Sequence, residues 1–332
     1  MKRQLMPAEW DRHEACLLAW PTHEKLWGES FKAIQEEYAG IVRAISEFEP
    51  VILVVPPGSS ERVRDLCDVD VATVEAPMDD SWLRASGPIF VYSAGKRIGV
   101  DFRFNGFGGR FFPHDQDDLV SRRLLHSLNI ERQATMTVLE GGAITVDGEG
   151  TLIATEQCVL NSNRNQHLGR CDLEAEFARL LGVEKVIWLP YGHLSGETDG
   201  HIDHVCQFAA RGRVITESCG SADRPDYLRL KANRAVLENC TDSRGRSLEI
   251  LEMPPQQRVH LFGRDGFVNY VNFYIANSGV VIPLAGTDSD EEALATARLA
   301  FPDHRVVGVE ARTLAIEDGG IHCITQQLPA HP

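Results

Sequence analysis

The sequence lacks the features that mark membrane, secreted and nucleic-acid-binding proteins. No apolar run approaches the roughly 18 residues that span a bilayer, and the opening segment MKRQLMP has no apolar stretch like that of a secretory leader. The eight cysteines form no CxxC pair, so they do not describe a disulfide framework. Basic residues are outnumbered, 33 against 48 acidic ones, and phosphate binding needs a basic surface. We therefore expect a cytoplasmic protein with reduced thiols and with no membrane or nucleic-acid partner.

Linkers, charge runs and low-complexity segments are also missing, which favours a single domain over residues 1–332. Strand-like apolar runs alternate with segments of helical spacing, as in α/β proteins. Residues 30–47 predict an amphipathic helix and Val51–Val55 a buried strand. Strand pairs separated by helices recur roughly every 50 to 70 residues, which indicates a repeat architecture. Further helices are predicted near residues 61–67, 117–127, 173–181, 227–239 and 291–301, and strands at 152–160, 201–208, 214–217 and 268–275.

A cysteine follows two glycines near the C-terminus, in the stretch DGGIHCITQQ (318–327), where it opens a predicted strand. Glycines let the backbone approach a ligand closely. A cysteine can act as a nucleophile when a neighbour lowers its pKa. The alternative is that Cys323 is a small buried hydrophobic residue, and this stretch alone does not decide between the two.

The segment GETDGHIDH (196–204) offers partners for such a cysteine. On a strand, His201 and Asp203 would project together and His204 would face the other side. The histidine could then move protons while the carboxylate holds a cation. A metal site is the alternative, but the spacing matches no common zinc signature. That alternative rests on six residues crowded into fourteen positions, His193, Glu197, His201, Asp203, His204 and Cys206.

Two more motifs carry candidate site residues. Glu140 in LEGG (139–142) could orient a histidine by accepting its ring N–H, or could be a solvated loop residue. Trp82 in DDSWLRASGP (79–88) could stack on a planar cation, or could belong to the core. Arg84 in the same motif would by default form a surface contact or an ion pair.

Together with PAEW (7–10), AWP (19–21), FNGFGG (104–109), VDGEGT (146–151), NRN (163–165) and NFYIAN (272–277), these motifs resemble those of the agmatine deiminase family, in the guanidine-modifying superfamily. The resemblance covers about residues 7–329. It implies an α/β fold of the pentein type, a five-bladed propeller of pseudo-fivefold ββαβ repeats. It also implies hydrolysis of agmatine to N-carbamoylputrescine and ammonia through a cysteine thiouronium, without metal or organic cofactor. The implied partner is a small cationic guanidino substrate, and a homodimer or higher homo-oligomer is allowed.

The resemblance also assigns roles. Cys323 matches the nucleophile, His201 the general acid/base and Glu140 the carboxylate that supports the histidine. Asp203 matches a carboxylate that grips the guanidinium, and Trp82 an aromatic wall beside it. The other expected substrate contacts are Asp79, Asn105 and Gly320.

Two positions depart from the family pattern. A second gripping carboxylate follows the motif arginine in the family, and here that position is Ala85. Thr145 stands where many members have histidine. Ala85 leaves two interpretations open: a substitution introduced to preserve bound substrate, or a natural branch with altered substrate or lost activity. The competing functions are a guanidine-binding protein without turnover, a zinc hydrolase and a papain-like protease, although nothing in the sequence suggests a peptide cleft.

Overall fold

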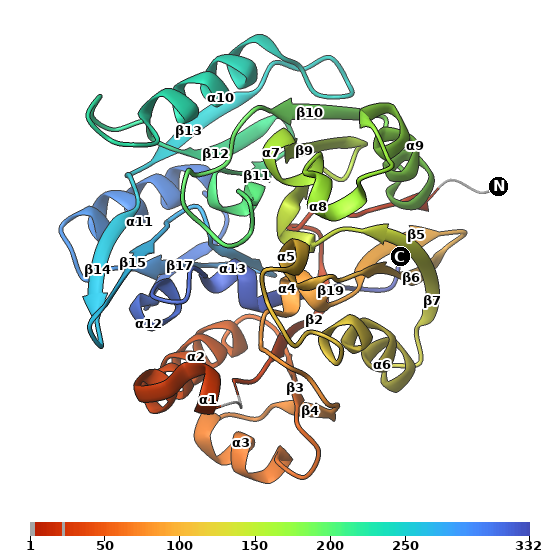
Figure 1. The fold of residues 1–332 in the computed structure, drawn as a ribbon, viewed down its shortest axis with the longest axis vertical. Coiled ribbons are helices and arrows are strands. Elements are labelled where there is room, and N and C mark those ends of the chain that lie inside the picture. The colour runs from red at the N-terminus through yellow and green to blue at the C-terminus, as the bar shows by residue number, and fades with distance from the viewer. Residues whose placement is uncertain (1–3, 22–23) are drawn as a thin grey trace.

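The computed structural model describes residues 4–21 and 24–332, so the first three residues of the MKRQLMP segment lie outside it. Its strands form five mixed sheets and one separate hairpin. The sheets surround a central region that holds the short helices α4 (Leu83–Ser86), α5 (Gly106–Gly109) and α13 (Ile321–Ile324). The longer helices lie toward the periphery (Figure 1). Each of the five sheets contains an antiparallel pair followed, across a helix, by a parallel strand.

Four of these sheets are continuous in sequence, each with the order strand, strand, helix, strand. They are β5 (Ile89–Ser93), β6 (Lys96–Arg103), α6 (Val120–Ser127) and β7 (Glu131–Val138); β8 (Ile144–Val146), β9 (Thr151–Thr155), α9 (Arg170–Leu181) and β10 (Lys185–Leu189); β11 (Cys206–Ala210), β12 (Arg213–Glu217), α10 (Tyr227–Asn239) and β13 (Glu249–Met253); and β16 (Tyr274–Ala276), β17 (Gly279–Leu284), α11 (Ser289–Ala300) and β18 (Arg305–Glu310). The N-terminal strand β1 (Gln4–Leu5) adds to β5.

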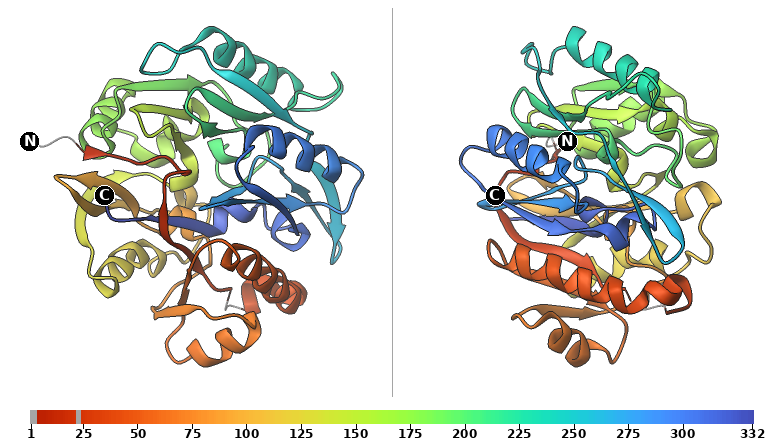
Figure 2. Two further views of the ribbon diagram at one scale, coloured as in Figure 1. Left: turned by 180° about the vertical axis from the view of Figure 1, so that it is seen from behind. Right: turned by 90° about the vertical axis from the view of Figure 1, so that its left-hand side faces the viewer.

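The fifth sheet joins the two ends of the chain. Strand β19 (Thr325–Pro329) pairs antiparallel with β2 (His13–Ala19), and β2 continues through α2 (Phe31–Ser46) into the parallel strand β3 (Val51–Val55). Helix α3 (Ser60–Cys67) and strand β4 (Ala72–Glu75) complete this sheet. Seen from behind, the N-terminal segment runs beside the C-terminal strand (Figure 2). The pairing holds the residues just before β19, including Cys323, at the centre.

The remaining elements are short. They are the hairpin β14 (Gln257–Leu261) and β15 (Arg264–Val268), and the helices α1 (Glu24–Trp27), α4 (Leu83–Ser86), α5 (Gly106–Gly109), α7 (Glu156–Val159), α8 (Ser162–Asn165), α12 (Arg312–Ala315) and α13 (Ile321–Ile324). Single 3-10 turns span Gly28–Ser30, Asp117–Leu119, Gly141–Ala143 and Ile202–His204. Among residues 4–21 and 24–332, no helix is long and apolar enough to cross a membrane.

The five mixed sheets confirm the predicted α/β class with five repeated units. Hydrophobic spacing also locates the long elements correctly. In α2, Ile34, Tyr38 and Ile41 are fully buried and belong to one hydrophobic cluster with β3. Helix α10 occupies the predicted residues 227–239. Apolar periodicity therefore identifies the elements that cover the sheets.

Several predicted strands are wrong in extent, and local hydrogen bonds explain each difference. The strand at 152–160 ends at Thr155, whose hydroxyl accepts from Cys158 N and caps α7. The strand at 268–275 is interrupted where Asn269 Oδ1 accepts from Val271 N. Side chains that bond to nearby backbone groups compete with a sheet ladder in this way. Strands β7, β8, β13 and β14 were not predicted.

The two segments with candidate catalytic residues also differ from the predicted strands. Residues 202–204 form a 3-10 turn in which Val205 N donates to Ile202 O at 2.8 Å, and β11 begins only at Cys206. Cys323 lies in the helical turn α13, and the Thr325 hydroxyl donates to Ile321 O at 2.9 Å before β19 starts. The rule that alternate residues share a face therefore does not apply at either segment.

Candidate active site

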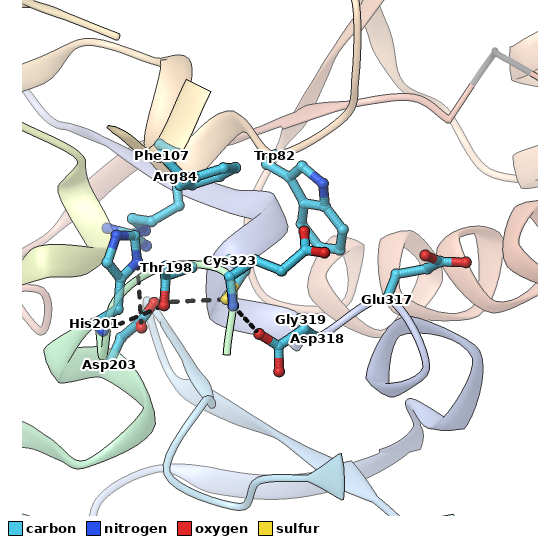
Figure 3. A pocket seen from close by; sticks show the side chains of 12 residues that line it. Trp82, Arg84, Phe107, Thr198, His201, Asp203, Glu317, Asp318, Gly319 and Cys323 are labelled. Carbon is cyan, nitrogen blue, oxygen red and sulfur yellow. Dashed lines mark hydrogen bonds and ion pairs between the residues drawn. The ribbon is translucent and has the colours of Figure 1, made fainter. Parts of the chain in front are cut away.

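One pocket collects most of the predicted site residues. Ala85 lines it from α4, and Trp82 from the position just before that helix. His201 and Asp203 reach it from the 3-10 turn region, and Cys323 from α13 (Figure 3). These residues come from parts of the sequence more than 100 residues apart. The fold brings them together in one pocket, and the short helices α4 and α13 lie in the central region between the sheets (Figure 1).

Cys323 is held by Asn272 as well as by its own helical turn. Asn272 Nδ2 donates to Cys323 Sγ at 3.2 Å, and Cys323 N donates to Asn272 Oδ1 at 3.2 Å. Gly320 precedes this turn, and a Cβ there would clash with Asn272 Oδ1. Glycine at 320 is thus required for the contact that positions the sulfur. The neighbouring Gly319 lines the pocket, and a direct contact of Gly320 with substrate stays a prediction.

His204 is the nearest imidazole to the sulfur, with Nε2 3.3 Å from Cys323 Sγ. The strand prediction placed His204 on the side away from His201, and this is wrong. Because the segment is a 3-10 turn, both histidines approach Asp203 Oδ1, His204 at 3.8 Å and His201 at 4.0 Å. Sequence reasoning did not give His204 a role, and only its place in the GHIDH motif could have suggested one.

The Cys323 thiol is neutral in the free protein. Burial and the adjacent Asp203 carboxylate raise its pKa well above the ordinary value, although the contact with Asn272 acts in the opposite direction. Asp203 Oδ2 lies 3.7 Å from the sulfur. A thiolate there would need a cation nearby to balance the carboxylate.

Asp203 belongs to a buried series of charged groups. Its Oδ2 lies 2.9 Å from His322 Nδ1, and His322 Nε2 lies 3.0 Å from both carboxylate oxygens of Glu9. Arg84 Nη1 donates to Glu9 at 3.2 Å. With carboxylates at both ring nitrogens, His322 is a double donor and therefore a cation.

The pKa values along this series follow from those contacts. Burial and Arg84 would lower the pKa of His322, but Glu9 and Asp203 outweigh them and raise it. Burial would raise the pKa of Asp203, but the bond with His322 and the neighbouring histidines lower it below the usual range. Asp203 is therefore ionised and aimed at the pocket. His322 was not predicted, although it stands directly before Cys323.

His201 is buried beside Glu140. A ring nitrogen of His201 and a carboxylate oxygen of Glu140 lie within 4.8 Å. The Glu140 Oε1 accepts from Arg164 Nε at 2.7 Å. Burial lowers the pKa of His201 although Asp203 and Glu140 oppose it, so the ring is neutral at pH 7. His201 Nε2 has no hydrogen-bond partner among the described residues. A neutral imidazole with a free nitrogen suits proton transfer.

The glycines after Glu140 allow this packing. A Cβ on Gly142 would lie 2.7 Å from His201 Nδ1 and 2.8 Å from Asp203 Oδ2. No side chain fits between them, so the LEGG motif serves the close approach of backbone to both site residues. Thr145, on β8, accepts from Phe208 N at 3.2 Å and has a structural contact.

Two predicted substrate contacts lie outside the pocket lining. Asp79 Oδ2 accepts from Gln116 N at 2.7 Å, so it fixes a loop. Asn105 caps α5, accepting from Gly108 N at 2.8 Å and donating to Asn163 O at 2.9 Å. The pocket residue of the FNGFGG motif is Phe107, which lies edge-on to His201 at a ring-centroid distance of 6.0 Å. Both side chains therefore stabilise their own loops, and their direct contact with substrate stays a prediction.

The mouth of the pocket is acidic. Glu197, Glu317 and Asp318 line the pocket, and Figure 3 shows the last two on the side away from His201. Asp318 Oδ2 accepts from Glu197 N at 2.7 Å, and Glu317 forms an ion pair with Arg264. Burial and the charges of Asp318 and Glu317 raise the pKa of Glu197. The carboxylates therefore repel one another and favour a cation among them.

The crowded histidines and acids do not gather around one point. His193 is paired with Glu217 and Asp226, and Cys206 is buried in β11. Among the described residues, two groups have metal-compatible spacing: Glu140 with Cys158 and His201, and Asp203 with His204 and Cys323. Each group has at least one member that lines the pocket, His201 in the first and Asp203 and Cys323 in the second.

Known proteins resemble the whole chain. Agmatine deiminase of Pseudomonas aeruginosa strain LESB58 is 40% identical over 353 aligned residues, covering 98% of this chain and 95% of the relative. Agmatine deiminase of Ectopseudomonas mendocina is 39% identical with the same coverage. The solved agmatine deiminase of Enterococcus faecalis superposes with a TM-score of 0.95 at 33% identity, covering 99% of this chain and 96% of that one. Residues 5–329 match the model of one family, and the chain therefore belongs to the Porphyromonas-type peptidyl-arginine deiminase family.

Proposed function

We propose that this protein hydrolyses the guanidine group of agmatine, giving N-carbamoylputrescine and ammonia through a covalent intermediate on Cys323. The observation that carries the proposal is the placement of Cys323 Sγ 3.7 Å from the ionised Asp203 in a pocket that His201 also lines. Relatives named agmatine deiminase over the full chain support the reaction.

The first half of the reaction replaces an amino group by sulfur. A guanidinium resists attack because its charge is delocalised, so it must be oriented and polarised. Asp203 binds two N–H groups of the cation, and Trp82 covers its planar face. The Cys323 sulfur attacks the guanidinium carbon, and the C–N bond to one terminal nitrogen breaks. His201 accepts the proton of the Cys323 thiol and passes it to that nitrogen, which leaves as ammonia, and an S-alkylthiouronium remains on Cys323.

The second half releases the product. Water takes the place of ammonia, and neutral His201 accepts a proton as the water oxygen bonds to the same carbon. The C–S bond then breaks, the sulfur recovers its proton, and the ureido product leaves. Glu140 beside His201 stabilises the imidazolium that forms in each half.

The substrate itself helps to ionise the thiol. Burial and the Asp203 carboxylate together hold the pKa of Cys323 high in the free protein. A bound guanidinium places a positive charge against Asp203 and cancels its effect on the sulfur, so the thiolate becomes accessible where it is needed. The free cysteine is thereby protected from other electrophiles.

The acidic mouth predicts selectivity for agmatine over arginine. The second ammonium of agmatine would lie near Glu197 and Asp318, whereas arginine would bring a carboxylate there. The basic residues near the site are engaged, Arg84 with Glu9 and Arg110 with Asp199. We expect kcat/KM to favour agmatine by at least about tenfold, or about 1.4 kcal/mol.

Steady-state kinetics with both substrates measures this ratio. Glu197→Gln should reduce it, while Glu291→Gln, at an exposed position on α11, should not. Comparable kcat/KM for agmatine and arginine would refute the assignment of the tail site.

Removal of metals should leave activity intact. In the proposed reaction, carboxylates and histidine supply the charge stabilisation, and a metal on the sulfur would block attack. Protein dialysed against a chelator should keep its kcat/KM, with well under one zinc per chain by elemental analysis. Stoichiometric zinc lost in parallel with activity would instead favour a zinc hydrolase.

The second candidate is a guanidine-binding protein without turnover, and Ala85 favours it. One carboxylate then grips the cation instead of the two expected for the family. Binding through Asp203 and Trp82 would persist while turnover is slow.

The remaining expectations are a single cytoplasmic catalytic domain without organic cofactor, and no nucleic-acid partner because the net charge is −15.

A further inference from the structure

Asp203 and Cys323, which line the pocket, form with the adjacent His204 a group of three potential zinc ligands. Cys323 Sγ lies 3.3 Å from His204 Nε2 and 3.7 Å from Asp203 Oδ2, and His204 Nε2 lies 3.8 Å from Asp203 Oδ1. Zinc bonds of about 2.0–2.3 Å at tetrahedral angles place neighbouring ligand atoms about 3.3–3.8 Å apart. One ligand atom from each of the three residues can be chosen so that all three lie within 4.8 Å of one another, which is compatible with three ligands around a single zinc ion.

We propose that Asp203, His204 and Cys323 form an inhibitory binding site for a thiophilic divalent cation such as Zn²⁺. The fourth ligand would be a water in the pocket. Thiolate, imidazole and carboxylate are a donor set that zinc accepts readily. Since the metal would occupy the sulfur and the carboxylate that the reaction uses, bound zinc prevents turnover.

Asp203 is prepared for such a ligand. Its Oδ1 is buried and has no hydrogen-bond partner among the described residues, although the side chain is fully buried. Its Oδ2 is held by His322 at 2.9 Å, which fixes the carboxylate from behind. Hydrogen bonds to the outer side of a metal-binding carboxylate are a regular feature of metal sites. Cys323 is partly exposed and lines the pocket, so a cation can reach it.

The other metal-compatible group fits a cation less well. Glu140 Oε1 already accepts a hydrogen bond from Arg164 Nε at 2.7 Å, so the positive charge of that guanidinium lies directly beside the Glu140 carboxylate. Cys158 is fully buried. The Arg164 guanidinium would repel a metal cation, and the buried Cys158 is closed to a cation from solvent. Both observations favour the group that contains Cys323 as the metal site.

Coordination at Cys323 is a simple exchange of bonds. Hydrated Zn²⁺ loses water ligands, and the Cys323 thiol loses its proton to solvent as the S–Zn bond forms. No electrons are transferred. A chelator reverses the process by removing the metal and restoring the thiol.

Metal titration of the full-length protein tests the site without relying on catalysis. Protein freed of metal by chelator is titrated with Zn²⁺ by calorimetry, and with Co²⁺ by absorption, where a thiolate-to-cobalt charge-transfer band reports a sulfur ligand. We expect one metal per chain. Cys323→Ser should remove the band, and His204→Asn should weaken affinity at least about a hundredfold, since loss of even an outer-shell partner costs 10–100-fold.

Two control variants separate this site from alternatives. Cys171→Ser removes an exposed cysteine and should leave binding unchanged. His201→Asn alters the Glu140 group and should also retain it. Circular dichroism verifies that each variant is folded. Unchanged affinity in folded His204→Asn, loss of binding in His201→Asn, or absence of stoichiometric binding would each overturn the proposal.

The inhibitory consequence rests on the proposed function and is tested separately. One equivalent of Zn²⁺ should abolish ureido formation, and excess chelator should restore it. Full activity with zinc bound would overturn the inhibitory role. Because metal binding is measured on its own, failure of the proposed reaction would be distinguished from failure of the metal site.

Discussion

Replacing Cys323 with serine should lower kcat/KM for agmatine by about 10⁴-fold or more, the scale seen when an enzyme loses its nucleophile. The serine hydroxyl is a much weaker nucleophile at neutral pH than a thiolate. Asn272 would still hold residue 323 and Asp203 would still accept the cation, so agmatine binding should persist. Ureido product and calorimetric affinity for agmatine are the two measurements.

Cys171→Ser is the matched control, because that cysteine is exposed and remote from the pocket lining. It should retain full activity. Turnover by Cys323→Ser within tenfold of the parent would remove Cys323 from the mechanism. Loss of both binding and activity would instead indicate that the pocket had collapsed.

Ala85→Asp should raise kcat/KM for agmatine by at least about tenfold and by up to about 10³-fold. Ala85 is 6% exposed and lines the pocket with Trp82 and Asp203. A carboxylate there would provide a second acceptor for the guanidinium. Removing one partner of a buried charged pair costs about 3–5 kcal/mol. We expect the new carboxylate to restore part of that free energy in the interaction with the guanidinium.

Ala85→Asn is the control of equal shape, since it offers an amide in place of the charge, and it should give little gain. Without substrate, a second carboxylate near Asp203 is repulsive, so we expect Ala85→Asp to unfold at lower temperature and agmatine to offset the loss. If folded Ala85→Asp shows no gain with agmatine, arginine or other guanidines, the site has been reshaped for another ligand.

The sequence predicts the long elements well because their stability comes from periodic apolar faces. Helix α10 and strand β3 coincide with their predicted ranges. Short elements at the site are less predictable, since 3-10 and helical turns of three or four residues leave no periodic pattern. The segment containing His204 is the instructive example. Treating it as a strand turned the imidazole away from the cysteine that it contacts.

The sequence identified which residues line the pocket better than it identified the hydrogen bonds between them. Motif resemblance selected Cys323, His201, Asp203 and Trp82, and all four line one pocket. The buried link from Asp203 through His322 to Glu9 could not be predicted, because Glu9 and His322 are 313 positions apart and meet only when β19 pairs with β2. Asp79 and Asn105 fix loops in the structure, a role that sequence cannot distinguish from ligand binding.

Trapping the covalent intermediate tests the central claim most directly. The protein, in its present form and as Ala85→Asp, is mixed with agmatine, quenched in acid during turnover, digested and weighed by mass spectrometry. Ureido product is measured in the same samples. Cys323→Ser in the Ala85→Asp background is the control. We predict an adduct with the mass of agmatine less ammonia on the peptide containing Cys323, and none in the control. An adduct on another cysteine, or ureido product formed by the Cys323→Ser control, would contradict nucleophilic catalysis by Cys323.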